Sequence, residues 1–166
     1  MKTFISYINN LLIPLLPETR CFALKRWMWK RAGVKIGRNV RISSSAKISG
    51  AGELLIGDNT WVGYQCTLIA SSRITIGANV DIAPKVYIGT GTHTINPNSE
   101  HIAATDISRD VIIGDGCWLC VNSTILPGTE LAAKTVVGAG AIVSSVFKED
   151  CILIAGIPAK KIKSYV

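Results

Sequence analysis

"IGDNTWVGYQCTLI", residues 56–69, contains the pattern from which the fold of this chain can be predicted. An aliphatic residue stands at 56, 62 and 68, six positions apart, and the spacing continues on both sides. Ile, Leu or Val occupies positions 36, 42, 48, 56, 62, 68, 76, 82, 88, 113, 119, 125, 131, 137 and 143. Small or β-branched residues follow most of these four positions later. A period of six fits neither an α-helix nor one alternating strand.

Short strands joined by corners explain this period. Three strands form a coil of about 18 residues, and coils stack about 4.8 Å apart with aliphatic residues in register around a dry axis. The first coils begin at Ile36, Ile56 and Ile76, so two extra residues sit at the same corner each time. A glycine follows the aliphatic residue where a corner needs positive φ or close backbone approach, at Gly37, Gly57, Gly77 and Gly114. We expect an all-β prism of about five coils.

Composition favours one domain without disulfides or metal. The chain has 166 residues, 48% of them hydrophobic but only 7% aromatic, which suits thin aliphatic layers. Five cysteines without a secretory signal indicate a reduced, cytoplasmic protein. Cys66 and Cys117 fall in the small interior positions, and Cys120 lacks the second pair of ligands that zinc needs.

The positive charge is concentrated at the N-terminus. Residues 1–35 hold seven of the 18 Lys and Arg residues and one of the 11 Asp and Glu residues. Residues 1–33 lack the six-residue period and predict short helices, one of them running from a Thr19 cap to a stop at Gly33. These helices either cap the open end of the prism or touch an anionic membrane through Trp and basic side chains; the two roles are compatible. No nucleic-acid-reading motif is present.

The stretch quoted above, together with "IGANVDIAPKVYIGTGTH" (76–93), "IGDGCWLCVNSTILPGTEL" (113–131) and "VVGAGAIV" (136–143), resembles the hexapeptide-repeat acyltransferases. The resemblance covers about residues 34–163. It is nearest to sugar O-acetyltransferases of polysaccharide biosynthesis and to galactoside and maltose acetyltransferases. It implies a left-handed parallel β-helix over 34–148, a homotrimer with active sites between subunits, and acetyl-CoA as donor. We expect a helical cap over 1–33 and a short C-terminal helix within 149–166.

The period lapses once, and the resemblance explains the lapse. Ile88 and Ile113 are 25 residues apart where six are expected, so a long loop, about residues 93–110, is extruded. "GTGTH" at its start resembles the family context of the catalytic base, which makes His93 the candidate. An imidazole can take the hydroxyl proton as the oxygen attacks the thioester, then pass it to the CoA sulfur. The alternative role is that of a loop histidine bonded to a carbonyl.

The acceptor side differs from the family pattern. Galactoside-type members carry an Asn that helps hold the acceptor near the positions of Tyr64 and Gln65, which makes these two residues the candidates for acceptor binding here. Thr94 follows His93 where many relatives have Asp. The group that orients His93 is therefore open among Glu100, Asp106 and a backbone carbonyl. His101, in mid-loop, is a weaker candidate for substrate contact.

Donor contacts are also implied by the resemblance. The pantetheine arm would pass the residues of "CWL" and "GAG", and basic residues near "GIPAK" would meet the nucleotide phosphates. These implied contacts are Trp118, Val121, Ala139 and Ser144 for the arm, and Lys160 and Lys163 for the phosphates. For Trp118 the alternative is an ordinary exterior position, and for the lysines a solvated tail.

We therefore expect a cytoplasmic acetyl-CoA-dependent O-acetyltransferase acting on a sugar hydroxyl of a surface polysaccharide or its precursor. Residues 1–33 are the candidate for peripheral contact with the inner face of the membrane. The alternatives are an N-acetyltransferase acting on an amino sugar or other amine, and a non-catalytic β-helix scaffold. A zinc-dependent carbonic anhydrase of the same fold would need more histidines than the two present.

Overall fold

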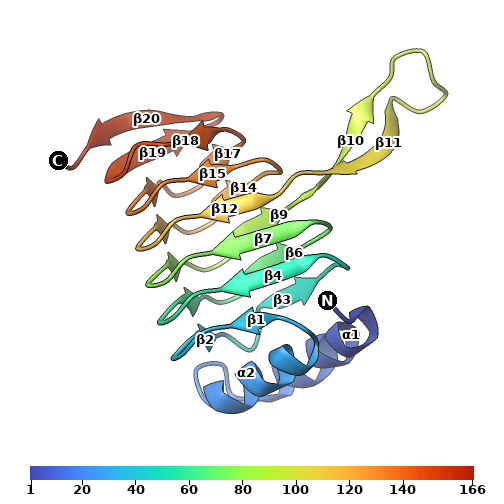
Figure 1. The fold of residues 1–166 in the computed structure, drawn as a ribbon, viewed down its shortest axis with the longest axis vertical. Coiled ribbons are helices and arrows are strands. Elements are labelled where there is room, and N and C mark those ends of the chain that lie inside the picture. The colour runs from blue at the N-terminus through green and yellow to red at the C-terminus, as the bar shows by residue number, and fades with distance from the viewer.

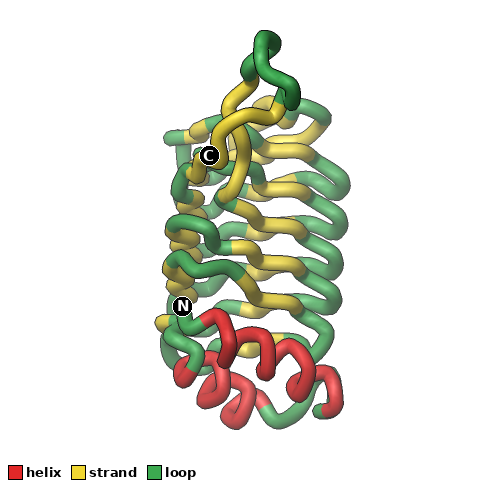
Figure 2. The backbone as a smooth tube through the Cα atoms, turned by 90° about the vertical axis from the view of Figure 1, so that its right-hand side faces the viewer, coloured by secondary structure: helices red, strands yellow, loops and turns green.

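The computed structural model describes residues 1–166 and is a parallel β-helix closed at one end by two short helices (Figure 1). The N-terminal elements are α1 (Thr3–Leu12), η1 (Ile13–Leu15) and α2 (Phe22–Arg31). Neither helix is long and apolar enough to cross a membrane. The strands that follow wind into stacked coils (Figure 2), and the all-β prediction is confirmed.

Three sheets form the sides of the prism. The first contains β1 (Lys35–Ile36), β4 (Glu53–Ile56), β7 (Arg73–Ile76), β12 (Val111–Ile113), β15 (Glu130–Leu131) and β18 (Val146–Phe147). The second contains β2 (Arg41–Ile42), β5 (Trp61–Val62), β8 (Asp81–Ile82), β13 (Trp118–Leu119), β16 (Val136–Val137), β19 (Ile152–Gly156) and β20 (Ala159–Ser164). The third contains β3 (Lys47–Ser49), β6 (Thr67–Ile69), β9 (Tyr87–Gly89), β14 (Thr124–Ile125) and β17 (Ile142–Val143).

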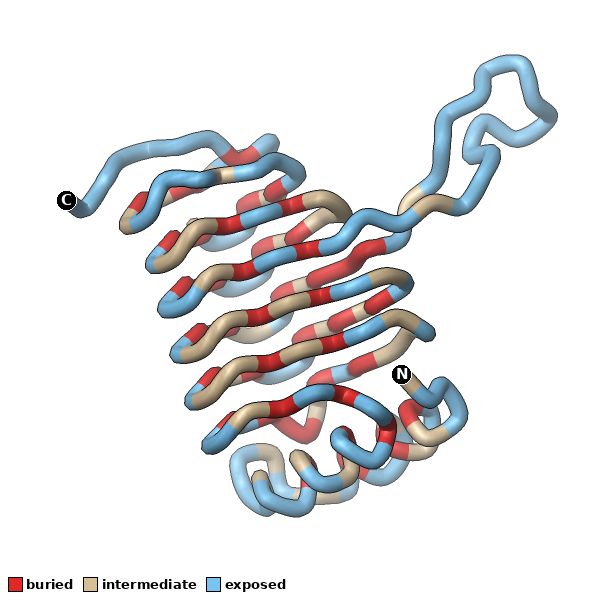
Figure 3. The backbone as a smooth tube through the Cα atoms, in the orientation of Figure 1, coloured by how far each residue is buried: buried red, intermediate tan, exposed pale blue.

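The register follows the aliphatic period. Ile36 pairs with Ile56, Ile56 with Ile76, and Ile76 with Ile113, so the ladder continues across the lapse in the repeat. All fifteen periodic aliphatic side chains are buried (Figure 3). The first sheet has six strands where about five coils were expected, because β18 adds a coil beyond the last clear repeat.

Two residue types, glycine and asparagine, form the corner that follows β1, β4 and β7. Gly57 does not need positive φ; instead, a Cβ there would lie 2.5 Å from the backbone nitrogen of Ala78 in the next coil. The left-handed residue is the asparagine two positions later, with φ of 59° at Asn59. Asn59 also donates through Nδ2 to Oδ1 of Asn79 at 3.2 Å. Close approach, not glycine flexibility, therefore explains Gly57.

The two ends of the chain correct the sequence-based expectations. The second helix begins at Phe22, with Cys21 in the left-handed region at its N-cap, so Thr19 does not cap it. It ends at Arg31, and the predicted stop residue Gly33 follows two positions later with φ of 91°. The predicted short C-terminal helix is wrong: β19 extends the second sheet, and β20 folds back antiparallel onto β19. This arrangement pairs backbone groups that an open sheet edge would leave free.

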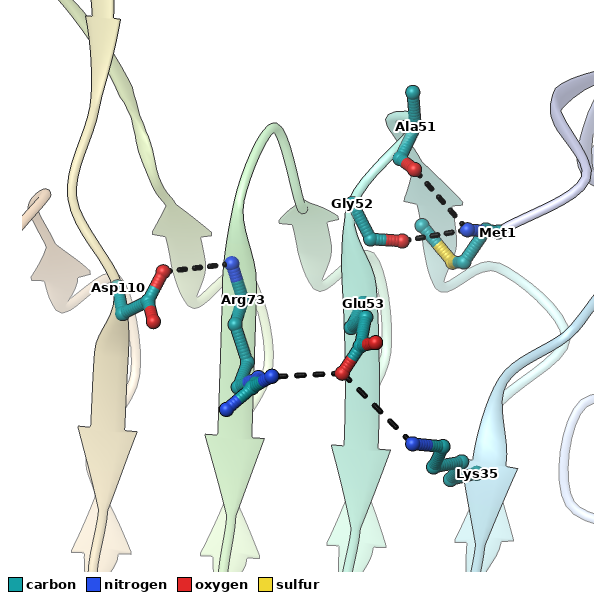
Figure 4. Close-up of polar contacts among 7 residues, drawn as sticks. All are labelled: Met1, Lys35, Ala51, Gly52, Glu53, Arg73 and Asp110. Carbon is teal, nitrogen blue, oxygen red and sulfur yellow. Dashed lines mark hydrogen bonds and ion pairs between the residues drawn. The ribbon is translucent and has the colours of Figure 1, made fainter.

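Polar contacts join neighbouring coils on the outside of the first sheet (Figure 4). The Glu53 carboxylate lies 3.8 Å from Nζ of Lys35 and 3.2 Å from Nε of Arg73, so one acid links three strands. The Met1 ammonium donates to the carbonyls of Ala51 and Gly52 at 3.2 and 2.6 Å. These contacts fix the start of α1 against the second coil.

Candidate active site

The segment that breaks the repeat is a projecting β-hairpin (Figure 1). Strands β10 (Gly91–Ile95) and β11 (Ala103–Ser108) pair antiparallel between the third sheet, which the chain leaves at β9, and the first sheet, which it rejoins at β12. The expected extrusion is present, but its stem is a paired ribbon and not a free loop. Pairing holds side chains on the stem more firmly than an irregular loop would.

The corner at residues 71–73 fixes both ends of the hairpin. Thr90, fully buried, accepts through Oγ1 from the N–H groups of Ser71 and Ser72 at 2.8 and 3.0 Å. On the returning side, Oδ1 of Asp110 accepts from the Arg73 N–H at 3.0 Å (Figure 4). This backbone hydrogen bond lowers the pKa of the Asp110 carboxyl. The base of the stem is therefore tied to the coil below.

His93 faces Asp106 across this stem. The two residues are register partners, and Nδ1 of His93 lies 2.9 Å from Oδ1 of Asp106. A carboxylate beside Nδ1 favours the ring form that is protonated there, which leaves Nε2 as the free acceptor of the ring. Of the three candidates for orienting His93, Asp106 is the one whose side chain the structure places beside the imidazole.

An open pocket of about 430 Å³ adjoins the pair, lined by Ser71, Gly91, Thr92, His93, Asp106, Ile107 and Ser108. Hydroxyl groups from Ser71, Thr92 and Ser108 give it a polar wall suited to a hydroxylated ligand. The imidazole side chain is 54% exposed and the carboxylate 91% exposed, so in a single chain the site is open to solvent. Ser71 carries no sequence signal: it joins this site only because its corner lies beneath the hairpin.

The structure does not bring the other predicted site residues to this pocket. Tyr64, Val121 and Ala139 follow second-sheet strands and precede third-sheet strands, so they occupy a different corner of the prism. They form one column there with Pro84 between them, since backbone hydrogen bonds join Lys85 N to Tyr64 O, Asn122 N to Pro84 O and Gly140 N to Val121 O.

The remaining candidates lie at the two corners and on the second sheet between them. Gln65 lies beside Tyr64 with φ of 56°. Trp118 starts β13 on the outside of the second sheet and is 52% exposed. Lys160 and Lys163 lie exposed on β20, the end strand of the same sheet. Ser144, however, follows β17 and lies at the corner between the third and first sheets, the corner from which the hairpin projects.

His101 lies exposed near the tip of the hairpin and does not line the pocket. The two histidines of the chain thus share one hairpin but differ in surroundings. His93 has a carboxylate partner and lines the pocket, whereas His101 does neither.

Comparison with known proteins identifies the family. The family model described as "Hexapeptide repeat of succinyl-transferase" matches residues 110–145. The chain is 38% identical over 148 residues, which is 86% of this chain and 78% of the relative, to the putative colanic acid biosynthesis acetyltransferase WcaF of Escherichia coli (strain K12). It is 35% identical over 124 residues, 70% of this chain and 63% of the relative, to the putative lipopolysaccharide biosynthesis O-acetyl transferase WbbJ of that organism.

A solved structure agrees in fold. Galactoside acetyltransferase in complex with coenzyme A superposes with a TM-score of 0.74 at 22% identity, covering 98% of this chain and 80% of that chain. The shared coil architecture and the close sequence relatives lead to one conclusion: the chain belongs to the hexapeptide-repeat acetyltransferases.

Proposed function

We propose that this enzyme is an acetyl-CoA-dependent O-acetyltransferase that modifies a sugar hydroxyl of a surface polysaccharide or its precursor. The observation that carries the proposal is the His93–Asp106 pair beside a pocket walled by hydroxyl groups. The names of the relatives support a polysaccharide acceptor, and the coenzyme A complex of a structural neighbour supports the donor.

The chemistry follows from the free nitrogen of His93. Nε2 takes the proton of the acceptor hydroxyl while that oxygen bonds to the thioester carbonyl carbon. The C–S bond then breaks, and the imidazolium returns the proton to the departing CoA sulfur. Asp106 acts as a positioning residue, because its carboxylate, 2.9 Å from Nδ1, holds the ring and favours the imidazolium that forms.

We also propose a homotrimer in which each site combines two copies. His93 lies on one corner of the prism, whereas Trp118, Val121, Ala139 and Lys160 lie along the second sheet and its other corner. A donor that follows the second group can meet His93 of an adjacent copy. Packing between copies would also enclose the exposed imidazole, and a rotational arrangement repeats the same contact around a closed ring.

A pair of histidine variants tests the catalytic role. We expect His93→Ala to lower acetyl-CoA-dependent acetylation by at least about 100-fold, and His101→Ala to leave the rate within about twofold. Release of the CoA thiol is measured with a panel of sugars, amino sugars and amines. Full activity in folded His93→Ala would contradict the proposed base, whereas a wild type that transfers acetyl to no acceptor would favour a scaffold.

Mixed assemblies test the two-copy site. His93→Ala and Ala139→Trp are each expected to be inactive alone, the second because the indole fills the donor's corner. Co-assembled in equal amounts, they should recover about a quarter of the wild-type rate, since about one site in four then receives both intact parts. If verified mixed trimers recovered no activity, His93 and the donor-binding residues of a site would belong to the same chain.

The lysines of β20 offer a matched comparison for the phosphate end. Lys161 is paired with Glu149 at 2.6 Å, whereas Lys160 has no acidic partner. We expect Lys160→Ala with Lys163→Ala to raise the KM for acetyl-CoA about fivefold or more at low salt. Lys161→Ala should leave this KM unchanged. If Lys161→Ala raised the KM as much as the double variant does, the assignment of Lys160 and Lys163 to the phosphates would be wrong.

A further inference from the structure

Helix α1 turns its polar side inward. Asn9 Nδ2 donates to the Met28 carbonyl at 2.9 Å, and the Asn10 amide both donates to and accepts from the Ile48 backbone at 2.7 and 3.2 Å. Ser6 is buried on the same side. An amphipathic helix on a globular protein usually buries its apolar side instead. Rotating α1 to do so would break the hydrogen bonds of both asparagines, so these contacts fix its orientation.

The outer side of the cap is correspondingly apolar. Phe4, Tyr7 and Leu11, spaced for one side of a helix, are 75%, 61% and 53% exposed. Further exposed apolar side chains come from the end of α1, from η1 and from α2. We call the whole set the end-cap surface; it comprises Phe4, Tyr7, Leu11, Leu12, Leu15, Leu24 and Trp27. Both helices close the same end of the molecule (Figures 1 and 3).

The charges at this end are mostly positive, although Arg20 lines a pocket together with exposed Asp81. Lys2, Arg20, Lys30 and Arg31 are exposed, and Arg31 lies over the Trp27 ring at 5.7 Å. Glu18 is the only acidic residue before Glu53. Its carboxylate accepts from the hydroxyls of Ser43 and Ser45 and from the Ser45 N–H, all in the first coil.

The buried cation of the cap is also satisfied internally. Lys25 is fully buried, and its Nζ donates to the carbonyls of Pro17 and Glu18 at 3.1 and 2.8 Å. Burial lowers the pKa of Lys25, which the nearby Glu18 carboxylate partly opposes. The ionic contacts inside the cap thus leave the four exposed basic residues free to meet an external anion.

We propose that the end-cap surface docks the enzyme on an anionic lipid bilayer, with α1 and α2 lying at the headgroup level. Aromatic and leucine side chains would enter the interfacial region while the basic residues meet lipid phosphates. A second copy is the poorer occupant, because two facing caps would bring like charges together with no carboxylate between them. This inference concerns location and is independent of the acyl transfer.

Vesicle co-sedimentation tests the proposal. We expect the full chain to bind phosphatidylcholine vesicles containing about 30% phosphatidylglycerol at least about tenfold more tightly than pure phosphatidylcholine vesicles, and less tightly as salt rises. Tyr7→Ser with Leu11→Ser should weaken binding about tenfold or more. The matched control is Ile95→Ser with Ile102→Ser, which removes two exposed apolar side chains from the hairpin and should not change binding.

The possible outcomes separate this proposal from the others. Both double variants should keep the wild-type melting temperature, and the end-cap variant should keep its acetyl-transfer rate in solution. Failure of the wild type to bind either vesicle would overturn membrane docking while leaving the catalytic proposal intact. A smaller mass for the end-cap variant in analytical ultracentrifugation would identify the surface as a contact between copies and would equally overturn it.

Discussion

Replacing Asp106 with Asn probes the ion-pair contact through which we propose that Asp106 positions His93. The two side chains are 2.9 Å apart, but they are 54% and 91% exposed in one chain, so water screens the charge. An exposed pair of this kind contributes about 1 kcal/mol or less, or roughly a fivefold effect on rate. Enclosed Asp–His pairs in other enzymes lose about 10⁴-fold on the same change. We therefore expect Asp106→Asn to lower kcat about five- to tenfold, with the upper value reflecting partial cover by a neighbouring copy.

The assay is steady-state thiol release with saturating acetyl-CoA. The KM for acetyl-CoA should stay within about twofold and the melting temperature within about 1 °C, because exposed Asp106 contributes little to stability. Glu100→Gln, which changes an acid elsewhere on the hairpin, is the control and should have no effect. An unchanged kcat in Asp106→Asn would refute the positioning role. A loss equal to that of His93→Ala would refute the reasoning from exposure.

Three predictions concern the scaffold. Asn59→Ala should be about 1 kcal/mol less stable than Asn59→Gly in urea unfolding, because both lose the amide ladder but only alanine is strained at φ of 59°; equal stabilities would contradict this. Burial raises the pKa values of Cys66 and Cys117 to about 11, so their stabilising contribution is complete below about pH 9 and declines as pH rises toward 11. The wild type should lose about 1.3 kcal/mol per thiol between about pH 8 and pH 10 relative to the double alanine variant, and parallel pH profiles would argue against buried thiols. Leu68→Ala should cost about 2–5 kcal/mol because the side chain is fully buried, whereas Leu24→Ala, 45% exposed, should cost less than about 0.5 kcal/mol; similar losses would disprove the layered core.

The prism was predictable because stacking imposes the same demand on every coil. A side chain that lies over its counterpart must be aliphatic and of similar size, so Leu68 pairs with Ile48 and Ile88. This repetition turns a three-dimensional requirement into a period visible in the sequence. The lapse of that period also located the hairpin, since residues outside the stack need no aliphatic side chain at every sixth position.

Contacts off the stack were not predictable in this way. Asp106 is 13 residues from His93, and only the register of β10 against β11 selects it over Glu100. The C-terminal strands form because β19 finds a partner in β16, which depends on where the prism ends. The inward side of α1 likewise depends on the carbonyls of Met28 and Ile48, which are distant in sequence.

The position of the interruption shows how the scaffold accommodates a functional insertion. Ile76 pairs with Ile113 across 37 residues, so the core stack continues as if the hairpin were absent. Closing a longer loop adds only about 0.6 kcal/mol per doubling of its length, and the Thr90 and Asp110 contacts fasten both ends to one corner. The stem is consequently free to vary in sequence without disturbing the layers, while strand pairing keeps His93 and Asp106 in register. A regular core and a single paired extrusion together place an exposed imidazole at a defined height on the prism.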